Sequence, residues 1–146
     1  MSVYFDILSA LQTRVSTAVG VNATVALRKR PVMLTGDPFP MIVIAPTDDG
    51  EIIEQEAFGG KVTYIYPAIV VMYLAGNRDQ DLDVEGYLAL RQTVRNAIYQ
   101  PLLGGASTVY DTQLNVGGPF IQVEQRATVE LTSFRVNYLS LEQRVA

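Results

Sequence analysis

The segment from Lys61 to Ala75 constrains the fold most, because it reads as a β-strand that becomes apolar on both faces. Successive side chains of a strand point to opposite faces, so the second half separates into two apolar sets: Ala68, Val70, Met72 and Leu74 on one face, and Ile69, Val71 and Tyr73 on the other. A strand with one wet face would alternate apolar and polar residues. We therefore expect a helix to cover one face and, as the most economical solution, a second copy of the protein to cover the other.

Composition narrows the classes of function. The 146 residues fit one domain with a sizeable core, and the chain contains neither cysteine nor histidine. This excludes disulfides and thiolate sites, and it removes the commonest general base and metal ligand. A net charge of -4 disfavours sequence-independent wrapping of nucleic acid. The composition therefore argues against an enzyme.

No membrane partner is expected either. The longest largely uncharged run, from Val62 to Asn77, contains Pro67 and is shorter than the ~20 residues of a spanning helix. The first residues show no basic leader of a targeting signal, which predicts that the protein starts in the cytoplasm.

Two segments have the periodicity of amphipathic helices. Residues 3 to 18 repeat apolar side chains at helical spacing, with Ser2 as the N-cap and Gly20 as the stop. Residues 84 to 98 form the second such segment, which ends near Pro101 and which Asp81 or Asp83 would cap.

Seven segments read as strands: Thr24 to Arg30, Met41 to Ala45, Glu51 to Phe58, Lys61 to Ala75, Val109 to Val116, Phe120 to Glu124 and Ala127 to Leu141. A two-residue turn at Gly59-Gly60 would place Phe58 opposite Lys61 in a hairpin. The apolar parity of the last strand changes near Ser133, which suggests a bulge or a face switch. We predict one α+β domain spanning residues 1–146, with a mainly antiparallel sheet and two helices packed on one face, in the order α-β-β-β-β-α-β-β-β.

Two charged motifs could bind a ligand, but each also has a purely structural interpretation. Residues 77 to 85 place Asn77, Asp79, Asp81, Asp83 and Glu85 at every second position, but the glycine and the final glutamate of a calcium loop are missing. Helix capping explains these acids better than metal binding does. The only basic run, Arg28-Lys29-Arg30, could contact phosphate, although a solvated strand end or a subunit salt bridge is the favoured interpretation.

In the order and the residue patterns of these segments, the chain resembles the tail terminator, or tail completion, proteins of long-tailed bacteriophages. The similarity spans nearly the full chain. It is carried by chain size, by element order, and by segments such as Tyr87 to Ile98 and Phe134 to Tyr138.

This resemblance implies a hexameric ring that caps the tail tube, ends its polymerisation and meets a head-side connector or stopper protein. A sheath protein would be a further partner in a contractile tail, and DNA would pass through the lumen without sequence-specific binding. The ring would reside in the neck region of the virion after assembly in the host cytoplasm. No catalytic residue or cofactor follows from it.

Candidate contact residues fall into two groups. We expect Tyr64, Tyr66, Ile69, Val71 and Tyr73 to contribute to the subunit interface. The long loops, Pro31 to Pro40 and Gly76 to Asp83, are the best candidates for contacts with tube or connector, and the lumen- or partner-contacting residues would be Arg28, Lys29, Arg30, Arg78 and Asp79. Two alternatives stay open: another neck, connector or tube component, and a cytoplasmic α+β ligand-binding module that dimerises through its sheet.

Overall fold

A computed structural model describes residues 2–56, 58–75, 84–99, 108–116, 122–123 and 129–143 of the chain. The helices are α1 (Val3–Val19) and α2 (Val84–Ile98), with short 3-10 turns at Gly20–Asn22 and Phe58–Gly60. The strands are β1 (Thr24–Leu27), β2 (Met41–Pro46), β3 (Ile52–Glu56), β4 (Lys61–Ala75), β5 (Val109–Val116), β6 (Gln122–Val123) and β7 (Val129–Gln143). The fold is α+β, and the predicted element order is confirmed.

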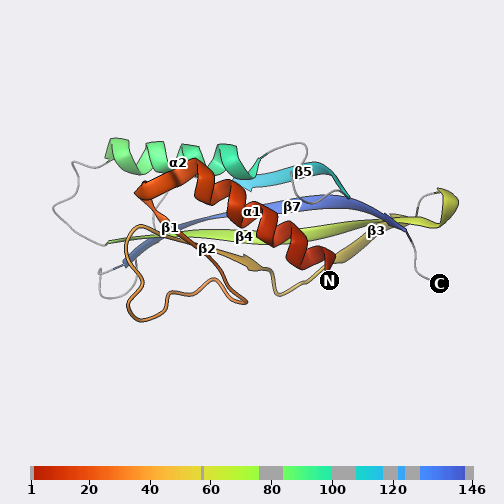
Figure 1. Cartoon of the computed structure of the whole chain (residues 1–146), viewed down its shortest axis with the longest axis horizontal. Helices are drawn as coiled ribbons and strands as arrows, with labels where there is room; N and C mark the ends of the chain where they lie inside the picture. The colour runs from red at the N-terminus through yellow and green to blue at the C-terminus, as the bar shows by residue number, and fades with distance from the viewer. Residues whose placement is uncertain are drawn as a thin grey trace.

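One sheet contains all of these strands, in the order β1-β2-β4-β7-β5, with β3 also paired to β4 and β6 to β7. Every pairing is antiparallel except that of β1 with β2. The long strands β4 and β7 pair along their whole length and form the centre of the sheet, as Figure 1 shows. β3 continues the edge of β4 beyond the end of β2, and therefore extends the sheet lengthwise.

Local sequence explains where α1 begins and ends. The hydroxyl of Ser2 accepts a hydrogen bond from the backbone N–H of Phe5, which satisfies a donor of the first turn. Gly20 ends the helix with a positive φ of 57°, a conformation that side chains with a Cβ rarely adopt. Both predicted end signals are confirmed.

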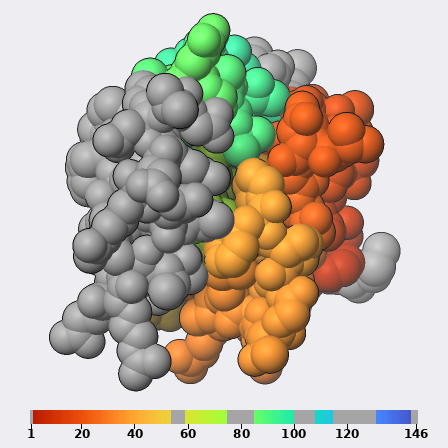
Figure 2. Space-filling model, turned by 90° about the vertical axis from the view of Figure 1, so that its left-hand side faces the viewer, coloured from red at the N-terminus to blue at the C-terminus, as the bar shows by residue number. Residues whose placement is uncertain are grey.

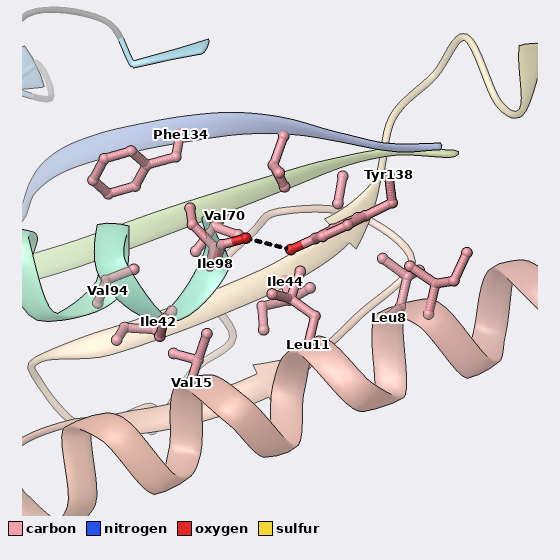
Figure 3. Packing of buried hydrophobic residues seen from close by; sticks show 14 of the residues in the cluster. Leu8, Leu11, Val15, Ile42, Ile44, Val70, Val94, Ile98, Phe134 and Tyr138 are labelled. Carbon is pink, nitrogen blue, oxygen red and sulfur yellow. Dashed lines mark hydrogen bonds between the residues drawn. The ribbon is translucent and has the colours of Figure 1, made fainter. Parts of the chain in front are cut away.

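The main core lies between the two helices and one face of the sheet. Figure 3 shows Leu8, Leu11 and Val15 of α1 directed at this face, with Ile42, Ile44, Val70 and Phe134 on the sheet and Val94 and Ile98 on α2. Tyr138 is fully buried among them, and its hydroxyl donates a hydrogen bond of 3.0 Å to the Ile98 carbonyl. The prediction that both helices pack on one face is confirmed.

A second, smaller core occupies the opposite face of the sheet. It consists of Met41, Val43, Val71 and Tyr73, with Ala26, Met33, Ile69 and Leu131 packed around it. Val70 and Val71 are therefore both buried, at 0% and 4% exposure, although they point to opposite faces. The unusual pattern of β4 is thus explained by two cores within one chain.

Two local predictions were wrong, and at a third position one of two alternatives is excluded. The hairpin before β4 pairs Glu56 with Val62, so its loop is longer than two residues, because Phe58–Gly60 forms a 3-10 turn of its own. The ladder of β7 against β4 runs without a shift through Ser133, which excludes a bulge there; the face switch is confirmed, because Leu131 packs against the second core and Phe134 lies in the main core. β1 ends at Leu27, before the basic run.

Candidate interaction surface

A loop from Arg28 to Pro40 connects β1 to β2 and covers part of the second face of the sheet. Met33 packs against the second core, and the hydroxyl of Tyr73 donates a hydrogen bond to the carbonyl of Pro31. Figure 1 shows this loop in orange at the lower left, and Figure 2 shows that its atoms reach the surface at that end of the molecule. The loop is therefore both a lid on the second core and part of the outer surface.

An internal ion pair fixes the shape of the loop. Arg28 donates two hydrogen bonds to the carboxylate of Asp37, at 2.6 and 2.8 Å, and the backbone N–H of Leu34 donates a third at 2.7 Å. These bonds favour the ionised carboxylate, so the Arg28 guanidinium and the Leu34 amide lower the pKa of Asp37 from 3.8 to about 2. The two hydrogen bonds of this ion pair join side chains that are nine positions apart in the sequence, and they hold the loop in one conformation.

The fixed loop presents apolar side chains to solvent. Val32, Leu34 and Phe39 are 48%, 57% and 42% exposed, whereas Met33 between the first two packs inward. We call these three residues the apolar loop face. Exposed apolar residues on a preorganised segment are typical of protein interaction sites, because little conformational entropy is lost when a partner binds.

A second exposed surface lies at the start of β3. Ile52 and Ile53 are 44% and 63% exposed, and within the described residues β3 pairs only with β4. The preceding turn carries three acids, of which Asp48 and Glu51 are exposed and Asp49 forms a 3.0 Å ion pair with Arg135. We call residues 48–53 the β3 edge. An open strand edge with exposed apolar side chains is a template for association.

Pro67 lies at the point where the neighbour of β4 on one side changes from β2 to β3. β2 pairs with β4 as far as Ala68, and β3 begins its pairing at Ile65, which leaves Pro67 in the gap. Its carbonyl accepts a hydrogen bond from the hydroxyl of Tyr4. The N and C=O of one residue point to the same side of a strand, so the N–H that proline lacks would face a position where no ladder partner exists.

The five predicted interface residues do not form one surface. Tyr64 and Tyr66 belong to the helix side, where the ring of Tyr66 lies 5.1 Å from that of Tyr4. Val71 and Tyr73 are buried under the chain's own loop, so the expectation that a second copy covers this face was wrong. Ile69, on the same face, is partly buried.

The five charged residues that were predicted to contact the lumen or a partner also differ in their surroundings. Arg28 is only 18% exposed at its side chain and is engaged with Asp37, whereas Lys29 and Arg30 are exposed. Arg78 and Asp79 lie outside the described residues, as do Asn77, Asp81 and Asp83 of the acidic series.

Sequence reasoning named the Pro31 to Pro40 loop but not its exposed side chains. The available signal was the run Val32-Met33-Leu34 between Pro31 and Gly36, an apolar stretch in a segment that cannot be a helix. Ile52 and Ile53 were assigned to a strand without any role. Exposure is a property of the assembled sheet, and a single strand does not reveal it.

Two polar side chains inside the described fold, Arg91 and Tyr66, form structural contacts. The guanidinium carbon of Arg91 lies 4.2 Å from the centroid of the Phe134 ring, and Arg91 donates a hydrogen bond to the Thr132 hydroxyl. The hydroxyl of Tyr66 donates to Glu142, and burial together with this carboxylate raises the Tyr66 pKa well above its usual 10. In the part of the chain that is described, no cluster of three or more acidic, histidine or cysteine residues could hold a metal ion.

Neither helix of the described segments is long and apolar enough to cross a membrane. A scan against protein-family models finds no match, and a search of curated proteins finds no relative of this chain.

Proposed function

We propose that the chain is a structural subunit of a bacteriophage tail, a terminator that assembles into a closed ring, six-membered as the resemblance implies. The observation that carries the proposal is the presence of two separate exposed apolar surfaces, the apolar loop face and the β3 edge, on one small α+β subunit. A subunit with two different adhesive surfaces can bind a neighbour on each side and so form a closed assembly.

The element order supports the same proposal, because it is the order on which the resemblance to tail terminators depends. The ring would cap the tail tube and stop its growth, present its other side to the head-side connector or stopper, and, in a contractile tail, adjoin the sheath protein. Its role is mechanical, so it needs neither a catalytic residue nor a cofactor. It would lie in the neck of the virion, with DNA passing through its lumen.

An assembly assay tests this function. Purified tube protein from the same phage is polymerised with increasing amounts of the chain, and tube lengths are measured by negative-stain electron microscopy. The proposal predicts that tubes become shorter as the chain is added and carry a ring at one end. Heat-unfolded chain is the control. An unchanged length distribution, with no density at tube ends, would contradict the proposed function.

A further inference from the structure

We propose that the apolar loop face of one copy docks against the β3 edge of the next copy, so that the subunits join head to tail. This inference rests on the proposed function and specifies the surfaces through which the ring closes. The evidence consists of the charges beside each surface, the positions of the two surfaces and the rigidity of the loop.

The charges beside the two surfaces are opposite. Lys29 and Arg30 are exposed next to the apolar loop face, and the backbone N–H of Val32 donates to the carbonyl of Arg30 at 2.9 Å, which places the basic pair and the loop face in one turn. At the β3 edge, Asp48 and Glu51 are exposed. Complementary charges of this kind steer two surfaces together and fix their orientation.

The same charges argue against symmetric pairing. Two apolar loop faces brought together would juxtapose Lys29 and Arg30 with their own copies, and two β3 edges would juxtapose Asp48 and Glu51 with theirs. Like charges brought together in an interface oppose association. The favourable combination joins unlike surfaces, which is a heterologous contact, and a heterologous contact produces a ring when its rotation closes.

The two surfaces lie on different segments of the subunit. The loop leaves β1 beside Ile44, near the end of β2, and returns to the start of β2, whereas β3 continues the sheet toward the other end of the molecule, as Figure 1 shows. A closed ring would bury the apolar loop face and the β3 edge of every subunit. The Arg28–Asp37 pair holds the loop face in place before docking, so the contact needs no rearrangement.

Mixing two single-surface variants tests the inference. Leu34→Glu places a charge in the loop face, and Ile53→Glu places one in the β3 edge; each is expected to weaken self-association at least tenfold, measured by sedimentation velocity over a concentration series. Each variant retains one intact surface. An equimolar mixture should therefore form a heterodimer and stop there, which native mass spectrometry detects directly.

Matched controls separate this effect from a general effect of new charges. Leu88→Glu changes an apolar residue of α2 with 45% exposure, and Tyr110→Glu changes a residue of the edge strand β5 with the same exposure. Both should assemble like the unmodified chain. Circular dichroism and thermal unfolding confirm that every variant is folded, which is expected because all four sites are exposed.

The outcomes separate the inference from the proposed function. Rings that form equally well with Leu34→Glu or Ile53→Glu would overturn the docking mode and leave the terminator function standing. Self-association lost only in the Leu34→Glu variant would indicate loop-to-loop pairing and would also overturn it. An unmodified chain that stays monomeric at all accessible concentrations would overturn the inference, whereas the proposed function is judged independently by the tube-length assay.

Discussion

Two adjacent valines of β4 provide a quantitative test of the two-core architecture. Val70 points to the helix side, between Ile44 and Phe134 in the neighbouring strands, and Val71 points to the second core beside Val43. Because the chain covers both faces by itself, Val70→Ala and Val71→Ala should each destabilise the isolated subunit. A strand whose second face depended on another copy would lose stability only at Val70.

The expected magnitudes follow from burial. Each substitution removes two buried carbon atoms, at about 0.8 kcal/mol each, or about 1.6 kcal/mol of lost transfer free energy. An unrelaxed cavity adds up to about 1 kcal/mol, so Val70→Ala should cost about 2–3 kcal/mol. The Arg28 to Pro40 loop can settle into the smaller space more easily than the helices can, so Val71→Ala should cost about 1.5–2.5 kcal/mol. At this chain length, 2 kcal/mol corresponds to a decrease in Tm of about 4–8 °C.

The assay is urea unfolding followed by circular dichroism, with all variants in the Leu34→Glu background so that assembly does not contribute. Val21→Ala is the control, because Val21 is fully exposed and its truncation should change stability by less than about 0.5 kcal/mol. If Val71→Ala is as mild as this control while Val70→Ala has its expected cost, the loop does not form a second core.

Three further predictions concern single interactions. The Asp37 carboxyl has a pKa lowered to about 2, so its contribution to stability is present above pH 3.8 and lost as the pH falls toward 2; Asp37→Asn should therefore destabilise the protein at pH 7 and converge with the unmodified chain in acid unfolding curves. Tyr138→Phe leaves the Ile98 carbonyl without its donor and should cost about 1–2 kcal/mol by urea unfolding. Burial raises the Tyr138 pKa, so the neutral hydroxyl is favoured in the fold and the stabilisation it gives is lost as the pH rises above 10; a pH-independent difference between the two proteins at high pH would contradict this. Gly20→Ala should lower stability by about 1 kcal/mol because of the positive φ at the end of α1, and an unchanged Tm would contradict that.

Periodicity predicted the elements well because it reports burial within one element. The bounds of α2, β4 and β5 agree with the sequence, and the end signals Ser2 and Gly20 of α1 were found correctly. These features depend on neighbours close in the chain. The same pattern also showed correctly that β4 is covered on both faces.

Contacts between segments that are distant in the sequence could not be predicted. The sequence could not show that the loop after β1 folds back over Val71 and Tyr73, because that contact depends on the Arg28–Asp37 pair and on the position of Met33. It also left open whether the pattern near Ser133 marks a bulge or a face switch, and only the ladder of β7 with β4 decides for the face switch. The exposed surfaces became apparent only when the sheet order was known.

We propose that copies of this chain form a ring at the head-proximal end of a phage tail, and cryo-electron microscopy of the assembled particle is the decisive experiment. We expect a closed ring of this subunit between the last tube layer and the head-side connector, with the Arg28 to Pro40 loop of each copy against β3 of the next. A particle whose neck contains no density for this fold, or which holds the chain at another location, would contradict it.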